Sequence, residues 1–325
     1  MSSSLIIWSN VSLPKSVSDL LRDRLGGHTL IAPEVADKSN LVAGPPDPSF
    51  ARADVAFGQP HPQDVVQSSN LKWVHLSSAG YTRYDTDALR AHASSRDLRF
   101  TNSSGVYNEP CAQHVLAMML SIARQLNGAQ DDQRAGSTWP YLPLREKSFL
   151  LNGQSALIVG YGAIGQRLAE LLAPFQMKLM GFRRTPTGRE SIPVRPISEI
   201  DAHLPTADHV INILPAAPGT QGFFDTKRIS TLKPGVRFYN IGRGNTVDQT
   251  ALVDALKSGR VDSSYLDVTD PEPLPASHAL WTAPNSFITP HTAGGHVNEF
   301  ERLTEHFLMN FDRFTTGQTL VDKIF

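Results

Sequence analysis

Three polar side chains that could reduce a carbonyl group follow late strand-like segments of this sequence. Apolar runs at 236–241, 264–268 and 286–289 lead respectively to Arg243, Glu272 and His291. Hydride addition to a carbonyl carbon leaves an oxygen that needs a proton, and histidine titrates near neutrality. A neighbouring carboxylate orients the imidazole and favours its charged form, while a guanidinium binds a substrate carboxylate. Each residue alone is more often structural, but their shared position at strand ends favours reduction of a 2-oxo acid.

The stretch 155–169 is the element that these residues need beside them. An apolar run leads into a turn through Gly160, Gly162 and Gly165, and a helical pattern follows. The first glycine permits a tight turn, the second lets backbone approach a pyrophosphate, and the third lets helix pack on strand. The exposed N–H groups at the helix start form an anion site. The pattern predicts a dinucleotide site; the alternative is a turn that needs glycine for packing only.

The end of the next strand-like run, 177–182, indicates which dinucleotide is bound. An NAD site places Asp or Glu about 20 residues after the glycine turn, to bind the ribose 2′-hydroxyl. This chain has Arg183, Arg184 and Thr185 there instead. Guanidinium groups pair with a phosphate that a carboxylate would repel. The sequence therefore favours NADP(H) over NAD(H), unless the two arginines are only a solvated loop pair.

Composition limits the classes of protein to consider. The chain has 325 residues, 40% hydrophobic and 19% charged, with a formal net charge of −1. This suits two domains of ordinary size and argues against nucleic acid or an anionic membrane as partner. The single cysteine, Cys111, permits no internal disulfide, and no basic residue precedes Lys15. We therefore expect a cytoplasmic protein without a signal peptide, a membrane span or a metal site.

The first hundred residues alternate strand-like and helical patterns, which is typical of a small parallel α/β domain. The expected strands are 5–9, 29–32, 53–57, 72–76 and 98–101. Small residues at 77–80 follow the fourth strand, at the edge where open sheets bind ligands. Their backbone N–H groups could hold a carboxylate; the alternative is an ordinary strand–helix turn. Residues 43–48 are expected as a loop. A helix is expected from Asn108, with Pro110 in its first turn, and 129–153 are expected to be irregular.

The second half completes a dinucleotide-binding domain. Six strands are expected, at 155–159, 177–182, 208–214, 236–241, 264–268 and 286–289. A last helix with one apolar face, from Phe300 to Phe314 and closed by Gly317, is expected to cross back to the first domain. The predicted fold is α/β: two doubly wound parallel-sheet domains, with a Rossmann dinucleotide-binding domain (104–294) inserted into a smaller flavodoxin-like substrate or lid domain (1–103 and 295–325).

An ordered set of motifs over nearly the whole chain resembles one family. The segments are 71–80, 101–106, 112–114, 160–165, 233–235, 242–244, 266–268, 272–273 and 289–291. In types and order they resemble the D-isomer-specific 2-hydroxyacid dehydrogenases, which include glyoxylate and hydroxypyruvate reductases. The resemblance implies that His291 is the acid/base, that Glu272 is its partner and that Arg243 binds the substrate.

The same resemblance implies the remaining contacts. Backbone at Ser78, Ala79 and Gly80 would hold the substrate carboxylate, and Asp267 would hold the nicotinamide carboxamide. The other implied cofactor contacts are Gly160, Tyr161, Gly162, Ala163, Ile164, Gly165, Leu214, Pro215, Ile241 and Gly242. Family members commonly dimerise, so a homodimer is expected, with Trp139 as a candidate to reach the partner's site.

The sequence departs from the family's motifs at two positions and leaves two alternative functions open. Arg183 replaces the family's acidic residue, and Gln113 replaces a Glu in the hinge motif. Relatives that act on formate lack the Glu of the Glu–His pair, so Glu272 disfavours that reaction. The alternatives are a dinucleotide-sensing protein of corepressor type with little turnover, and the same enzyme class acting on a bulkier 2-oxo acid or a phosphite-like anion.

Overall fold

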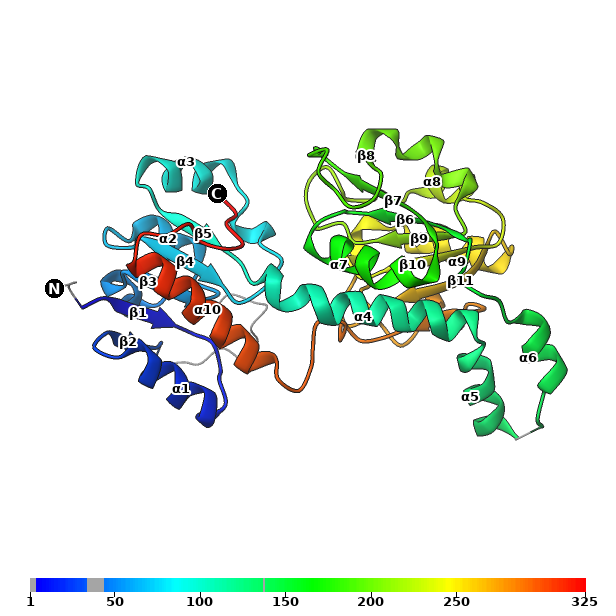
Figure 1. The fold of residues 1–325 in the computed structure, drawn as a ribbon, viewed down its shortest axis with the longest axis horizontal. Coiled ribbons are helices and arrows are strands. Elements are labelled where there is room, and N and C mark those ends of the chain that lie inside the picture. The colour runs from blue at the N-terminus through cyan, green and yellow to red at the C-terminus, as the bar shows by residue number, and fades with distance from the viewer. Residues whose placement is uncertain (1–3, 34–43, 137) are drawn as a thin grey trace. The chain divides into compact units, whose positions relative to one another are not determined.

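The chain forms two compact units, each built on a parallel sheet. The structure, a computed structural model, describes residues 4–33, 44–136 and 138–325. The first unit comprises Met1–Tyr107 and His296–Phe325, and the second Asn108–Gly295 (Figure 1). The sequence placed these boundaries at 103/104 and 294/295. The division of substrate and nucleotide roles between the two units stays a prediction.

The first unit is a five-stranded parallel sheet in the order β2-β1-β3-β4-β5. Its strands are β1 (Ile6–Ser9), β2 (Thr29–Ile31), β3 (Val55–Gly58), β4 (Trp73–Leu76) and β5 (Arg99–Thr101). Its helices are α1 (Lys15–Leu25), α2 (Pro62–Gln67), α3 (Asp87–Ser95) and α10 (Glu299–Thr315). This order is that of flavodoxin-like sheets, as expected from the sequence.

The last helix packs on the first unit, as its apolar face predicted. In Figure 1, α10 is the red helix among the blue elements at the start of the chain. The Phe307 ring of α10 stacks on Phe57 of β3, with centroids 4.3 Å apart, and on Trp73 of β4 at 5.4 Å. All three side chains are fully buried. The first unit is therefore assembled from both ends of the chain.

The second unit is a seven-stranded parallel sheet in the order β12-β11-β10-β9-β6-β7-β8. Its strands are β6 (Ser155–Val159), β7 (Lys178–Arg183), β8 (Val194–Pro196), β9 (His209–Asn212), β10 (Val236–Asn240), β11 (Val261–Leu266) and β12 (Ser286–Ile288). Apart from α4, which is described below, its helices are α5 (Leu126–Ala135), α6 (Tyr141–Lys147), α7 (Ala163–Leu172), α8 (Thr226–Thr231) and α9 (Gln249–Lys257). The chain crosses from one side of β6 to the other before β9, so the order reverses there, as in a Rossmann fold.

Three expectations about this unit were wrong. The sheet has a seventh strand, β8, which is too short and proline-bounded to be recognised from its pattern. Residues 129–153 include parts of α5 and α6, neither of which has a buried residue to give an apolar period. In the first unit, residue 43 of the loop expected at 43–48 lies outside the described residues, residues 44–47 are irregular as expected, and Pro48 begins a 3-10 helix.

The third wrong expectation concerns α4 (Ser104–Ala123), which begins before Asn108 and carries Pro110 inside it. The Asn102 carboxamide oxygen accepts the Ser104 N–H at 3.2 Å, so an Asx turn at Asn102 leads directly into the helix. The proline had suggested a start because a first-turn residue needs no intrahelical acceptor. The boundary between the two units falls within this helix.

Tyr161 of the glycine turn is a core residue. It is 1% exposed, and a Cβ built on Gly181 of β7 would lie 2.7 Å from its ring. A Cβ on Gly165 of α7 would also lie 3.4 Å from the same ring. The tyrosine thus fills the space that two glycines leave between strand and helix. Its side chain serves packing, and its N–H is bonded to the Phe182 carbonyl at 2.8 Å.

This packing predicts the effect of Gly181→Ala. The added methyl group overlaps a fully buried ring, so we expect a destabilisation of about 1–3 kcal/mol, the usual cost of overpacking. Chemical denaturation followed by circular dichroism measures it. Gly219→Ala is the matched control, because a Cβ there meets no atom within 4 Å. Equal stability of the two variants would contradict the packing assigned to Tyr161.

Candidate active site

The glycine turn has the geometry that a dinucleotide needs. Gly160 has φ of 100°, and a Cβ there would lie 2.8 Å from the Ile213 backbone. A Cβ on Gly165 would lie 3.0 Å from the Ile158 side chain, so this glycine serves helix–strand packing. Gly162, in contrast, is exposed and a Cβ on it meets nothing within 4 Å. The second glycine therefore borders open space, where a ligand could approach the backbone.

The donors for a pyrophosphate are the first-turn N–H groups of α7. The N–H groups of Gly160, Tyr161 and Gly162 already donate to backbone carbonyls. The first N–H groups of a helix have no intrahelical acceptor, which applies to Ala163 and Ile164. Both residues are partly exposed and directly follow the open face of Gly162. The turn thus fits an anionic group at the helix N-terminus.

Glu272 and His291 form a hydrogen-bonded pair. The His291 Nδ1 lies 2.8 Å from Glu272 Oε2, and the other carboxylate oxygen accepts the Thr269 N–H at 3.0 Å. The two side chains are 34% and 38% exposed. Because both carboxylate oxygens are bonded, the glutamate fixes the ring and leaves Nε2 as the nitrogen that faces away from it. His291 has φ of 54°, an unusual conformation for this residue type that is common at functional sites.

Asp267 organises the loop that carries His291. Its Oδ1 accepts from the Thr289 hydroxyl at 2.7 Å and the Thr292 N–H at 2.9 Å, and its Oδ2 accepts the Ala293 N–H at 3.0 Å. The Asp267 carbonyl accepts the His291 N–H at 2.8 Å. Asp267 is 3% exposed. The structure therefore assigns it a positioning role in this unit, and its predicted contact with a nicotinamide stays a prediction.

His114 of α4 completes this arrangement. Its Nε2 lies 3.1 Å from the Thr289 hydroxyl and 3.6 Å from Asp267 Oδ1. Burial lowers the pKa of His114, and the nearby Asp267 carboxylate opposes this only in part. Because the Thr289 hydroxyl donates its one hydrogen to Asp267, the neutral His114 ring donates its Nε2–H to the threonine oxygen without adding a charge. The helix and the His291 loop are thus joined through one buried carboxylate.

A buried network that sequence reasoning missed fixes the loops after β9 and β10. Asn212 and Asn240 occupy paired positions at the ends of these strands. The Asn212 amide donates to Asn240 Oδ1 at 3.0 Å and to the Thr246 hydroxyl at 2.7 Å. Asn212 Oδ1 accepts the Leu214 N–H, and Asn240 Oδ1 also accepts the Gly242 N–H. The sequence signal, an Asn at the end of each apolar run, was present and went unused.

Glycines lock neighbouring loops together around Arg243. A Cβ on Gly242 would lie 2.5 Å from the Leu214 carbonyl oxygen, and one on Gly244 would lie 2.0 Å from the Thr269 carbonyl. Backbone touches backbone at both places. Arg243 between them is partly exposed, and its Nη1 donates to the Gly242 carbonyl at 2.6 Å. The arginine therefore stands on the same rigid edge as the Glu272–His291 pair.

Other residues that the sequence predicts to contact the cofactor lie at the same edge. Ile241 and Leu214 are buried, at 6% and 4% exposed. Arg183 ends β7, and Arg184 and Thr185 are exposed in the loop that follows. Glu190, from later in that loop, lies 3.6 Å from the Arg183 guanidinium. Sequence reasoning did not connect Glu190 with this position.

The predicted substrate loop lies in the first unit, directly after β4. The carbonyls of Ser78, Ala79 and Gly80 accept bonds from the Ser103 N–H, the Asn102 amide and the Ser78 hydroxyl. With the carbonyls held from within the unit, the loop is fixed, and Ala79 and Gly80 are partly exposed. This fits a backbone site for an anion.

The Gln113 departure has a local explanation. The Gln113 amide donates to Glu109 Oε1 at 2.6 Å, one helical turn earlier on α4. Glu109 also pairs with Arg167 of α7. A glutamate at 113 would place two carboxylates together, and the amide avoids that repulsion.

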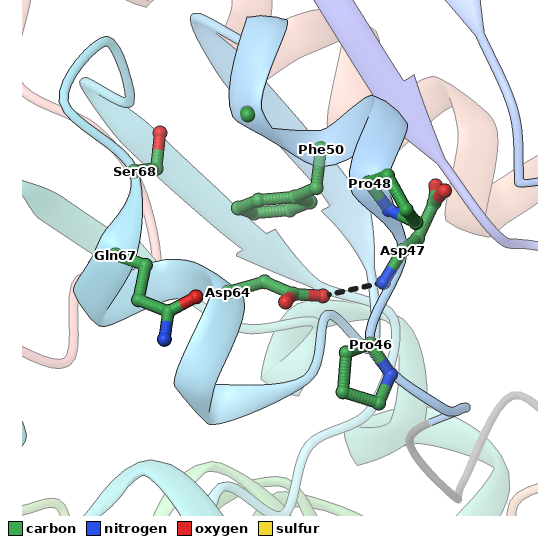
Figure 2. A pocket seen from close by; sticks show the side chains of 8 residues that line it. Pro46, Asp47, Pro48, Phe50, Asp64, Gln67 and Ser68 are labelled. Atoms are coloured by element: carbon green, nitrogen blue, oxygen red, sulfur yellow. Dashed lines mark hydrogen bonds between the residues drawn. The ribbon is translucent and has the colours of Figure 1, made fainter.

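The first unit also has a hollow between the 3-10 helix Pro48–Arg52 and α2. Figure 2 shows Phe50 as one wall and the Asp64 carboxylate accepting the Asp47 N–H, at 2.9 Å. Asp47 in turn caps the 3-10 helix by accepting the Ser49 N–H. The acidic groups here are bonded to the chain's own backbone, so they serve local structure.

No group of three or more His, Cys, Asp and Glu side chains in 4–33, 44–136 and 138–325 could hold a metal ion. No helix in that part of the chain is long and apolar enough to cross a membrane.

Comparison with known proteins identifies the family. Residues 116–293, more than half of the chain, match the family model of the D-isomer-specific 2-hydroxyacid dehydrogenase NAD-binding domain. The chain belongs to this family. The expected family, the two parallel-sheet domains and the enzyme class, an NAD(P)-dependent oxidoreductase, are thereby confirmed.

Named relatives and solved structures agree. The chain is 30% identical to a glyoxylate reductase of Pyrococcus furiosus over 80% of this chain and 79% of that one. It is 28% identical to glyoxylate/hydroxypyruvate reductase B of Escherichia fergusonii over 87% of each. A family member from Xanthobacter autotrophicus, solved with NADPH and MES, matches with a TM-score of 0.79 and 25% identity over 99% of this chain and 98% of that one.

The open face of Gly162 predicts a variant that folds but does not bind. Gly162→Ala adds a methyl group where no protein atom lies, so the thermal midpoint should stay within about 2 °C, the scale of a negligible free-energy change. Dinucleotide affinity should fall at least about tenfold, because the methyl group occupies the approach to the helix N-terminus. Calorimetric titration measures it, with Gly27→Ala, also open, as the control. Undiminished affinity would contradict the assignment of this turn.

Proposed function

We propose that this family member reduces a small 2-oxo acid of the glyoxylate or hydroxypyruvate type to the D-2-hydroxy acid, with NADPH favoured over NADH. The observation that carries the proposal is the Glu272–His291 hydrogen bond of 2.8 Å at an edge that also presents Arg243. The names of the relatives from Pyrococcus furiosus and Escherichia fergusonii support the substrate class.

His291 supplies the proton. Its Nδ1 is engaged by Glu272, so Nε2 is the atom that donates to the carbonyl oxygen as hydride adds to the carbon. Glu272 keeps the ring in one orientation, with Nε2 directed away from the carboxylate. After the transfer, the neutral ring retains its bond to the carboxylate and can be protonated again from solvent. In the oxidation direction the same nitrogen acts as base.

Arg243 holds the substrate. Its guanidinium can fork onto the carboxylate of a 2-oxo acid and polarise the adjacent carbonyl. Backbone N–H groups at Ala79 and Gly80 are proposed to bind the same carboxylate.

NADP(H) would be held by groups of the second unit. Ala163 and Ile164 would meet the pyrophosphate, Leu214 and Pro215 would border the adenosine side, and Asp267 would lie near the nicotinamide. When bound, the reduced nicotinamide supplies the hydride. Arg183, Arg184 and Thr185 are proposed to bind the ribose 2′-phosphate. The Xanthobacter autotrophicus structure with NADPH supports this choice.

A homodimer is part of the proposal. Five large apolar side chains in the segment 126–150 are exposed by 49–85%: Leu126, Trp139, Tyr141, Leu142 and Leu150. Such a concentration marks an interaction surface. Sedimentation equilibrium should give twice the mass of the chain, and Leu142→Glu should shift it toward the monomer. A wild-type monomer would contradict this part of the proposal.

The activity test compares four chains with NADPH and NADH, each with glyoxylate and hydroxypyruvate. Wild type should oxidise NADPH faster than NADH. His291→Gln should lose about 100-fold or more in kcat, the scale of one acid catalyst, and Glu272→Gln about tenfold or more. Cofactor affinity should be unchanged in both, because neither side chain is assigned to it. His61→Gln, in the first unit, is the control.

Full turnover by His291→Gln would show that the assigned acid is wrong. Faster turnover with NADH would keep the reductase and remove the role of the arginines. Tight dinucleotide binding without turnover on either acid would favour a bulkier 2-oxo acid first and the corepressor-type sensor second; the intact Arg243, Glu272 and His291 disfavour the sensor.

A further inference from the structure

The loop after β7 contains a carboxylate, that of Glu190, which lies close to Arg183 although the two residues are seven positions apart in the sequence. Where NAD-binding relatives of this fold have an acidic residue, this chain has Arg183. The chain then turns back, and Glu190 places its Oε1 3.6 Å from Arg183 Nη1. A carboxylate and a guanidinium thus lie close together at the end of β7.

One oxygen of Glu190 collects several donors. Its Oε1 accepts the Thr187 N–H at 2.7 Å and the Thr187 hydroxyl at 2.9 Å, and it faces the Arg183 guanidinium. The Glu190 side chain is 6% exposed, whereas that of Arg183 is 33% exposed. A backbone N–H, a hydroxyl and a guanidinium that converge on one oxygen are the donors that proteins use for phosphate.

The carboxylate is charged at neutral pH. Hydrogen bonding from the Thr187 backbone N–H, more than any other cause, lowers the pKa of Glu190 to about 2. The loop is also tied to the glycine turn, since the Tyr161 hydroxyl lies 3.3 Å from the Ser191 hydroxyl. The charge therefore stands in a fixed loop beside the candidate dinucleotide site.

We propose that Glu190 is an internal anion that competes with the 2′-phosphate of NADP(H) for Arg183 and Thr187, and so sets the preference between the two dinucleotides. This inference rests on the proposed function, which places the ribose at the end of β7. A bound 2′-phosphate must displace the carboxylate from Arg183 or tolerate its repulsion. NAD(H) brings no such charge and meets no such penalty.

The informative variant is Glu190→Gln, which keeps the size and an oxygen acceptor for Thr187 but removes the charge. Affinity for NADPH should rise at least about fivefold, because the uncharged amide no longer repels the 2′-phosphate or competes with it for Arg183. Affinity for NADH should change less than about twofold by the same reasoning. Adding Arg183→Gln to Glu190→Gln should abolish the gain, since the guanidinium is the group that the carboxylate withholds.

The experiment is calorimetric titration of wild type and variants with NADPH, NADH, and 2′,5′-ADP against 5′-AMP. Glu199→Gln is the control, an exposed glutamate of the neighbouring 3-10 helix Ile197–Ala202. Retained NADH affinity reports that Glu190→Gln is folded, and its thermal midpoint gives a second check. Improved affinity confined to the ligands with a 2′-phosphate supports the inference.

Three results would overturn it. Weaker NADPH binding by Glu190→Gln would mean that the carboxylate positions Arg183 for the phosphate. An unchanged ratio of NADPH to NADH affinity would mean that Glu190 only shapes the loop. Binding of neither dinucleotide by wild type would overturn the proposed function as well, so the two failures are distinguishable.

Discussion

Direct contact between backbones, permitted by glycine, is the constraint on which the rest of the site depends. Gly160 lies against the Ile213 backbone, Gly242 against Leu214 and Gly244 against Thr269. At each position, the Cβ of any other residue would overlap the neighbouring backbone. These contacts join the loops after β6, β9, β10 and β11 in order along the sheet edge. A site whose members must be held within about 0.5 Å gains from such a frame, because glycine contacts leave no side-chain rotamers to adjust.

Polar groups complete what the glycines begin. The hydrogen bond between the buried Asn212 and Asn240 side chains joins the loops after β9 and β10. Asp267 binds the loop that carries His291. Every one of these groups is bonded to backbone or to another member, as buried polar groups must be. The side chains to which we assign chemistry, those of Arg243, Glu272 and His291, remain at least partly exposed. Structure and chemistry are thus divided between buried and exposed polar residues.

The sequence predicted the parts of this site that depend on local order. The glycine turn follows from residues close together and the apolar face of α10 from a regular period. The Glu272–His291 pair follows from the strand-end positions and from the family resemblance. The predicted start of α4 was wrong because Pro110 suggested a start near Asn108, whereas the helix begins at Ser104, directly after an Asx turn at Asn102. Glu190 was missed because its partner is set by how a loop returns, and no period or spacing encodes that path. The substrate-binding roles at 78–80 stay predictions.

The most direct test of the account follows the hydride itself. Hydroxypyruvate would be incubated with NADPH carrying deuterium on the transferred position, and the product analysed by mass spectrometry and chiral chromatography. The account predicts D-glycerate with one deuterium on C2, since hydride from the nicotinamide and a proton from His291 reach opposite ends of one carbonyl group. Product of the L configuration, or turnover without deuterium at C2, would contradict it.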